Sequence, residues 1–314
     1  MSSTSSKLVK IGLRLTLRPL LKHTSLDQQV KLSIRESTRP VDYTHLRLPG
    51  GAKAQPLTVS GVPAEWITAP DSQPERVMLY IHGGGWVVGS ISSHRHLIAR
   101  LAQSCRMRLL AINYRLAPAH PYPAALEDCL AAYRWLLVQG VDPHQLVVAG
   151  DSAGGNLTLT TLLALRQAGD PLPAAAVCLS PATDLSTAIR PEDARKDPLL
   201  DPGAGQRWLE AYLAGQDPAQ PLVSPLFGDL HGLPPILIQI GTDEMLYPDA
   251  IRFSEKARQS GVDLTLDIWE GMFHVWQLSA PLLPEANQAI RKIGEYVQGK
   301  VNFHVATAKI QERP

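Results

Sequence analysis

The sequence predicts an α/β fold whose central sheet is mostly parallel and covered by helices on both faces. From about residue 64 of 314, apolar runs of strand length alternate with segments whose apolar residues recur at helical spacing. The runs 77–81 and 146–150, for example, are apolar throughout instead of alternating with polar residues. That pattern is typical of parallel strands that are buried on both faces.

The expected elements follow one another in a regular order. The helix at 123–140 has proline at its start and glycine at its end, which is the favoured asymmetry of helix ends. Antiparallel strands at the start of the sheet are compatible with this order. Strands are expected at 64–70, 76–82, 108–114, 145–150, 174–180, 235–241 and 264–270, and helices at 94–104, 123–140, 154–169, 247–261 and 283–299.

The N-terminal segment has the pattern of a basic amphipathic helix. Leu8, Ile11 and Leu15 recur at helical spacing, as do Leu13, Leu17 and Leu20, and basic residues interrupt every apolar run. We therefore expect neither a signal-peptide core nor a spanning segment, and a cytoplasmic protein. Such a helix lies either on a membrane surface or over part of the same protein, and the frequency of amphipathic helices favours the second.

Composition excludes several function classes. The formal net charge is +1, so no global field favours nucleic acid or an anionic membrane. Cys105, Cys129 and Cys178 are scattered without metal-ligand spacing, which indicates buried thiols in a reducing compartment. We expect no metal, no nucleic-acid partner and no stable membrane insertion; a homodimer is left open.

The most informative motif is Gly150-Asp151-Ser152-Ala153-Gly154, a G-x-S-x-G between an expected buried strand and an expected helix. That context is the one a nucleophile elbow requires, because a serine on a sharp turn needs small neighbours. The helix that follows points its N-terminus at Ser152 and favours developing negative charge. The alternative is a serine N-cap beside a glycine turn.

A second motif, His82-Gly83-Gly84-Gly85-Trp86, ends an earlier strand of the same sheet. One glycine would suffice for a tight turn, whereas three allow the backbone N–H groups to approach a ligand closely. Together with the N–H of Ala153, such a loop would stabilise the oxyanion that forms when a serine attacks an ester carbonyl.

A base and an acid are expected after Ser152, in the order acid then histidine. His274 follows an expected strand and a glycine turn, whereas His231 lies in a polar turn before a strand. Asp243 and Glu244 both follow the strand at 235–241, and we expect Asp243 to be the acid because it comes first. Asp184 is the competing candidate for the acid. If Asp243 is not the acid, its expected role is that of a negative charge at a helix N-terminus.

These motifs resemble those of the hormone-sensitive lipase family of α/β-hydrolases, the bacterial family IV esterases. The matching stretches are HGGGW, GDSAGGNL, YRLAPAHPYPAALED, GTDEML and GMFH, in the family's order over about residues 64–300. The resemblance implies an α/β-hydrolase fold, a Ser152-Asp243-His274 triad and an oxyanion hole of Gly84, Gly85 and Ala153. It also implies short to medium acyl esters as substrates, without metal or cofactor.

The resemblance further implies a helical cap over the catalytic domain. Residues 1–50 and 185–224 are expected to form the cap, 51–184 and 225–300 the catalytic domain, and 301–314 a C-terminal tail. The expected substrate pocket is apolar and is lined by residues of the cap and of the catalytic motifs: Trp86, Asp151, Leu246, Trp276, Leu13, Leu17, Trp208 and Leu213. The competing functions are a catalytically silent receptor and a serine peptidase or amidase. The presence of His274 argues against the first, and the lack of a large extra domain against the second.

Overall fold

One eight-stranded sheet forms the centre of the molecule, in the order β1-β2-β4-β3-β5-β6-β7-β8. The computed structural model describes residues 3–187 and 197–311. The pairs β1–β2 and β2–β4 are antiparallel, and every other neighbouring pair is parallel. The strands are β1 (Lys53–Val59), β2 (Val62–Thr68), β3 (Gln73–Ile81), β4 (Met107–Ile112), β5 (Leu146–Asp151), β6 (Ala175–Leu179), β7 (Ile236–Gly241) and β8 (Leu264–Trp269).

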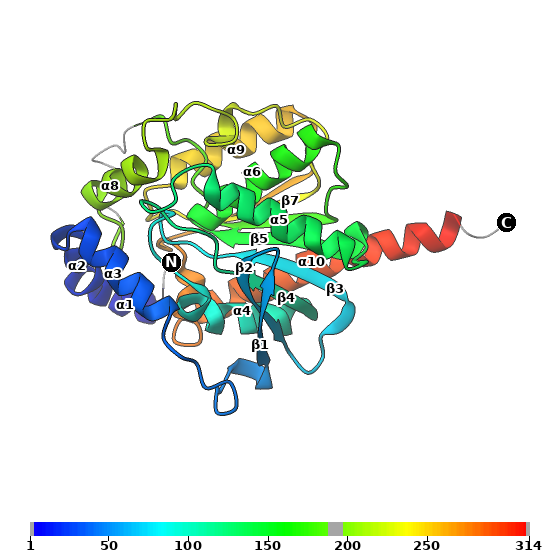
Figure 1. Ribbon diagram of the computed structural model, residues 1–314, viewed down its shortest axis with the longest axis horizontal. Helices are drawn as coiled ribbons and strands as arrows, with labels where there is room; N and C mark the ends of the chain where they lie inside the picture. Colours follow the sequence, from blue (N-terminus) through cyan, green and yellow to red (C-terminus); the bar gives the residue numbers. More distant parts are fainter. Residues whose placement is uncertain (1–2, 188–196, 312–314) are drawn as a thin grey trace.

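Helices cover both faces of the sheet, as the continuous apolar strands predicted (Figure 1). Apolar residues of α5, α6 and α9 pack on one face, and those of α4 and α10 on the other. These helices are α4 (Ile91–Cys105), α5 (Ala124–Val138), α6 (Ala153–Ala168), α9 (Tyr247–Gln259) and α10 (Pro284–Gln311). No helix in the described part of the chain is both long and apolar enough to cross a membrane.

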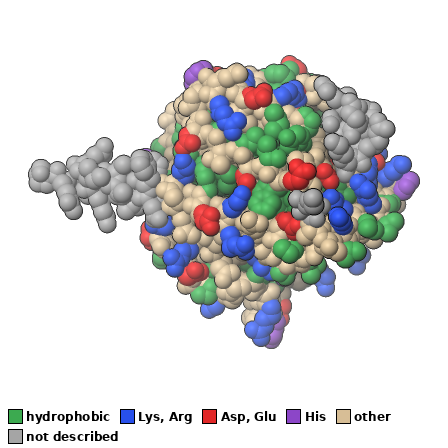
Figure 2. All heavy atoms as spheres, turned by 180° about the vertical axis from the view of Figure 1, so that it is seen from behind, with side chains coloured by type: hydrophobic (Ala, Val, Ile, Leu, Met, Phe, Trp, Pro, Cys, Tyr) green, Lys and Arg blue, Asp and Glu red, His purple; other side chains and the backbone are tan. Residues whose placement is uncertain are grey.

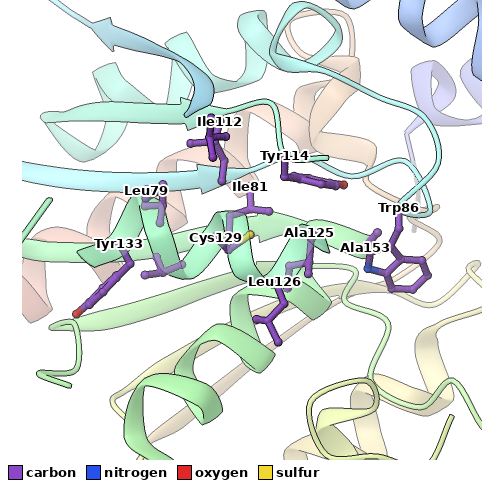
Figure 3. Packing of buried hydrophobic residues seen from close by; sticks show 14 of the residues in the cluster. Leu79, Ile81, Trp86, Ile112, Tyr114, Ala125, Leu126, Cys129, Tyr133 and Ala153 are labelled. Carbon is purple, nitrogen blue, oxygen red and sulfur yellow. The ribbon is translucent and has the colours of Figure 1, made fainter. Parts of the chain in front are cut away.

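The core reaches the carboxyl edge of the parallel strands. Figure 3 shows Leu79 and Ile81 of β3 packed with Cys129 of α5, while Trp86 and Ala153 lie at the rim of the same cluster. The loops after β3, β5, β7 and β8 all leave the sheet at this edge, because parallel strands present their carboxyl ends on the same side. The fold therefore brings both glycine motifs and both later loops together.

Four further helices lie together at one end of the molecule: α1 (Thr4–Leu15), α2 (Leu17–His23), α3 (Leu26–Ser37) and α8 (Pro202–Leu213) (Figure 1). The side chain of Arg207 donates a hydrogen bond to the carbonyl of Leu21, at 3.1 Å, and so joins α8 to α2. The N-terminal helices thus lie over the same protein, and this contact joins residues that are 186 positions apart in the sequence.

Two expectations for the chain need correction. β1 was not specified from the sequence, although it pairs with β2 along its whole length. The last helix was expected to end near residue 299, with a tail from residue 301, but α10 continues to Gln311. The stretch from 300 to 311 contains neither proline nor glycine, so nothing in its sequence stops the helix.

Candidate active site

Ser152 lies on the sharp turn between β5 and α6, with φ of 53° and ψ of −117°. A non-glycine residue in this region of backbone space is strained, and the strain is maintained by the strand and helix on either side. A Cβ atom at Gly154 would collide with the carbonyl oxygen of Ile81, and one at Gly150 with the carbonyl oxygen of Gly154. The small residues around Ser152 thus let β3 and β5 approach the turn closely.

His274 lies in the loop after β8, and its imidazole joins the serine to a carboxylate. Its Nε2 is 2.9 Å from Ser152 Oγ, and its Nδ1 is 2.9 Å from Glu244 Oε2. The imidazole and the carboxylate are both buried. When Nδ1–H donates to Glu244, the lone pair of Nε2 faces the serine hydroxyl, which is the arrangement that a general base needs.

The expected contact between Asp243 and His274 is wrong. Asp243 turns away from the imidazole, and its Oδ2 lies 2.9 Å from Lys10 Nζ of α1. Glu244 occupies the acid position because its Oε1 accepts hydrogen bonds from the backbone N–H of Gly241, at 2.6 Å, and from the hydroxyl of Ser180, at 3.0 Å. These bonds fold the longer side chain back over the end of β7, so that Oε2 reaches His274.

Asp184 does not contact His274 either. Its carboxylate accepts hydrogen bonds from Ser186 and Thr187 and forms an ion pair with Arg252 at 2.8 Å. Its role is to order the chain that follows β6. His231 is also remote from the site: its Nδ1 pairs with the exposed Asp229, two residues away, at 2.7 Å.

The electrostatic surroundings of His274 favour its protonation. Burial alone would lower the pKa of this imidazole, but the hydrogen bond to Glu244 and the charge of its carboxylate outweigh burial, so the pKa lies above its ordinary value. Glu244 therefore stabilises the imidazolium that forms when His274 takes a proton.

Lys10 connects the two loops that carry the acid and the histidine. Besides its contact with Asp243, the Nζ of Lys10 donates to the carbonyl of Gly271 at 3.0 Å. The loops also bind each other directly, because Gly271 N–H donates to Thr242 Oγ1 and Asp243 N–H to the carbonyl of Met272. The first helix is thus attached to the segments that position Glu244 and His274.

The glycine loop lies beside Ser152. Gly85 and Ala153 line the same cavity as the serine. Gly84 has φ of 120°, and a Cβ atom there would collide with the carbonyl oxygen of Val88, so only glycine fits. As the first residue of α6, Ala153 has an N–H group with no acceptor inside its own helix. This local structure suits donors aimed at a developing oxyanion.

Asp151, which was expected to line the pocket, lies buried beneath it instead. Its Oδ1 accepts hydrogen bonds from Tyr80 OH at 2.7 Å and from Gly83 N–H at 3.1 Å. Its Oδ2 lies 3.3 Å from Nε2 of His94 on α4. This carboxylate, one residue before Ser152, therefore fixes the start of the glycine loop relative to the nucleophile turn.

The two buried histidines near Asp151 have pKa values shifted in opposite directions. Burial and, to a lesser extent, the neighbouring His94 lower the pKa of His82 to about 4, so His82 is neutral. Burial also opposes protonation of His94, but the charge of Asp151 and the hydrogen bond to it raise the pKa of His94 above its ordinary value. Asp151 thus favours the protonated form of His94, and His82 stacks on Tyr114.

A cavity of about 670 Å³ opens at Ser152. Of the pocket residues expected from the sequence, Trp86, Trp208 and Leu246 line it. Gly85, Ser152 and Ala153 of the catalytic motifs also line it, as does Asp184, which was considered only as the acid. The other members of its wall were not singled out from the sequence: Ala182, Leu185, Thr187, Leu200, Gly205, Leu209, Met245, Tyr247, Pro248, Asp249, Ile251 and Arg252.

Four other residues that were expected to line the pocket lie elsewhere: Leu13, Leu17, Trp276 and Leu213. Leu13 packs against a cluster beneath the histidine loop that includes the fully buried Trp276. Leu213 is buried in the core beside Trp208, and Leu17 is largely exposed. Apolar side chains near a site fit a core as well as they fit a pocket, and the sequence alone contains no signal that separates the two.

Comparisons with known proteins show that the chain is similar to esterases with the α/β-hydrolase fold. A family described as having the α/β hydrolase fold matches residues 78–278. An acetyl-hydrolase of Streptomyces hygroscopicus is 47% identical over 244 residues, which cover 77% of this chain and 81% of that protein. An esterase of Acinetobacter venetianus is 39% identical over 246 residues, covering 77% and 80%.

Solved structures show the same likeness. The crystal structure of the esterase EstE5 has a TM-score of 0.88 at 39% identity and covers 96% of this chain and 100% of that one. An esterase from the bacterial hormone-sensitive lipase family has a TM-score of 0.78 at 41% identity, covering 88% and 98%. The chain belongs to this family of α/β-hydrolases. The family's motifs in this hydrolase are the stretches that converge on Ser152.

Proposed function

We propose that this esterase hydrolyses carboxylic esters through an acyl-enzyme on Ser152, with His274 as the base and Glu244 as the acid of the triad. The observation that carries the proposal is the chain of two 2.9 Å contacts from Ser152 through His274 to Glu244, which begins in the wall of the cavity. Nucleophile, base and orienting carboxylate are the three parts that nucleophilic acyl transfer requires.

In this mechanism the serine oxygen attacks the ester carbonyl while Nε2 of His274 takes its proton. The imidazolium then gives that proton to the leaving alcohol oxygen as the carbon–oxygen bond breaks, which leaves an acyl group on Ser152. Water repeats the sequence, with His274 again as base, and releases the carboxylic acid. Throughout, Glu244 holds Nδ1–H and stabilises the imidazolium.

The N–H groups of Gly84, Gly85 and Ala153 are proposed as the donors to the oxyanion. Removing one such donor costs roughly 3–4 kcal/mol of transition-state stabilisation where it has been measured. Asp151 supports this arrangement from below through its bond to Gly83 N–H.

The cavity supports short to medium acyl chains as substrates. Its wall includes Trp86, Trp208 and Leu209, so each added methylene should contribute up to roughly 0.8 kcal/mol until the space is filled. The helices of 1–50 and 185–224 are proposed to form the cap that closes it. The similar Streptomyces protein is named an acetyl-hydrolase, and a structure of EstE5 was obtained after soaking with p-nitrophenyl butyrate.

The proposal is tested with p-nitrophenyl esters of graded acyl length. We expect kcat/KM to rise from acetyl to about butyryl or hexanoyl, and to fall steeply beyond about ten carbons. Ser152→Ala is the control that measures hydrolysis outside the site. Highest activity on emulsified long-chain triglycerides would refute the proposed substrate range, and unchanged hydrolysis by the Ser152→Ala variant would refute the proposed nucleophile.

A further inference from the structure

The N-terminal helices expose an unusual amount of apolar surface. Among the described residues, seven of the twelve exposed large apolar side chains lie between residues 8 and 34. Five of them are on α1 and α2: Leu8, Ile11, Leu15, Leu17 and Leu20. A soluble monomer seldom gathers such side chains on one element without a partner for them.

Helix α1 has two separate apolar faces. Val9 and Leu13 point inward and pack against the cluster under the histidine loop. Leu8, Ile11 and Leu15 follow one another at intervals of three and four residues, which places them on one stripe of the opposite side. Their exposed fractions are 65%, 54% and 74%. The fold of this chain therefore uses the first face and leaves the second one open.

The same segment carries a large excess of positive over negative charge. Residues 1–40 contain eight Lys or Arg and two Asp or Glu, a net charge of +6, whereas the whole chain is +1. The remaining residues therefore carry a net charge of −5. Figure 2 shows hydrophobic side chains next to Lys and Arg side chains at the end of the molecule away from the projecting helix. The charge asymmetry gives this end an attraction for anionic surfaces that the net charge conceals.

We propose that α1 and α2 dock the protein on an anionic bilayer surface. Leu8, Ile11 and Leu15 enter the boundary between headgroups and acyl chains, and Lys7 and Lys22 lie against anionic headgroups. A second copy of the chain is a poorer partner for this face, because a symmetric dimer would bring two segments of +6 together.

The docked face is joined to the wall of the cavity at Ser152. Helix α8, whose Trp208 lines the cavity, is bound to α2 through the hydrogen bond from Arg207 to the carbonyl of Leu21 at 3.1 Å. The indole N–H of Trp208 also donates to Gln29 Oε1 of α3 at 2.8 Å. Docking through α1 and α2 would therefore hold the cavity close to the bilayer. If the proposed ester hydrolysis holds, substrates that partition into the headgroup region reach the site at a raised local concentration.

The experiment is co-sedimentation of the full-length protein with vesicles of phosphatidylcholine, with and without 30% phosphatidylglycerol. We expect binding to the anionic vesicles that weakens with added salt. Leu8→Ser/Ile11→Ser/Leu15→Ser should lower the partition coefficient by at least about 100-fold, at about fivefold per side chain. Lys7→Gln/Lys22→Gln should lower it by about 30-fold, which corresponds to ~1 kcal/mol per lysine.

Matched controls change the same chemistry elsewhere on the surface. Val138→Ser/Leu282→Ser removes apolar side chains that are 81% and 77% exposed, and Lys53→Gln/Arg291→Gln removes two positive charges from β1 and α10. Both should bind vesicles like the wild type. All variants should hydrolyse a soluble ester within about twofold of the wild type, because none of these residues lines the cavity, and that assay reports on the proposed function separately.

Three results would overturn the proposal. The first is that the wild type does not bind the anionic vesicles. The second is that the apolar triple variant binds them as well as the wild type does. The third is that the wild type binds both vesicle types equally. A change from dimer to monomer in the triple variant on size-exclusion chromatography, without vesicle binding by the wild type, would assign the face to a second copy of the chain instead.

Discussion

Replacing Glu244 by Gln tests the assignment of the acid most directly. The change removes one negative charge and keeps the size of the side chain. In the structure both carboxylate oxygens are engaged: Oε2 by His274 Nδ1, and Oε1 by Gly241 N–H and Ser180 Oγ. An amide has one NH₂ group and one oxygen, so it cannot accept on both sides.

Each orientation of the amide has a cost. If the NH₂ group points toward Gly241, it faces the buried backbone N–H of Gly241, and both groups are donors. The 2.6 Å hydrogen bond that Glu244 Oε1 accepts there is then lost. With its NH₂ toward His274, it donates to Nδ1 and forces the proton onto Nε2, where it blocks the base. Replacing a triad carboxylate by its amide lowers kcat by roughly 10⁴ through such a tautomer change, and we expect a loss of that order.

The matched control is Asp243→Asn, one residue earlier. Asp243 contacts Lys10 and not the imidazole, and the pair is partly exposed, with side-chain fractions of 15% for Lys10 and 31% for Asp243. Such pairs contribute about 0–1 kcal/mol, so kcat should change less than about tenfold. Stopped or continuous assays with p-nitrophenyl butyrate measure both variants, and thermal unfolding verifies that each is folded.

A pH profile adds an independent readout. In Glu244→Gln the charge that raises the pKa of His274 is gone while burial remains, so the acid limb of the residual activity should move to lower pH. If Asp243→Asn lost about 10⁴ in kcat while Glu244→Gln stayed near wild type, the assignment would be refuted. An unmoved acid limb in a folded Glu244→Gln protein would refute the electrostatic part.

Other predictions follow from the same contacts. Ser152→Ala should retain the fold and less than about a thousandth of wild-type kcat; a higher residual rate in a purified sample would exclude Ser152 as nucleophile. Because the base must be neutral and its pKa is raised, wild-type kcat/KM should fall with decreasing pH around a midpoint above 6.5, and a flat profile from pH 5 to 8 would contradict this. Lys10→Met should lower kcat by roughly 3–10-fold with KM nearly constant, whereas Lys7→Met should not; steady-state kinetics that show a change in KM alone would assign Lys10 to substrate binding. Asp151→Asn should destabilise the fold by about 1–3 kcal/mol in urea unfolding, because an amide cannot accept from Tyr80, Gly83 and His94 as the buried carboxylate does, and an unchanged midpoint would mean that these contacts contribute nothing to stability.

Much of the fold could be predicted because its signals are local. Largely apolar runs predicted the parallel strands β3 to β7, whereas β8, at the edge of the sheet, contains the polar residues Thr265 and Asp267. Proline and glycine marked the ends of α5. The position of Ser152 followed from a strand, a small-residue turn and a helix, which are adjacent in sequence. His274 followed from a glycine turn after β8. In each case the residues that decide the structure lie within one short window.

The acid could not be chosen in the same way. Asp243 and Glu244 are neighbours after the same strand, and their order in the sequence favoured the wrong one. The outcome depends on Gly241 and Ser180, which bind Glu244 Oε1, and on Lys10, which holds Asp243 from 233 residues away. Gly241 belongs to the GTDEML stretch itself, but Ser180 and Lys10 are brought to it only by the fold, so the stretch alone does not distinguish the two carboxylates.

The N-terminal helices consequently have a part in the chemistry that differs from the one expected of a lid. The sequence predicted that they supply apolar residues to the pocket, so that removing them would mainly weaken substrate binding. In the structure neither Leu13 nor Leu17 lines the cavity, whereas Lys10 bridges the loops of Glu244 and His274. Loss of α1 should therefore disturb the alignment of acid and base, which acts on kcat, more than it disturbs the volume in which the acyl chain is bound.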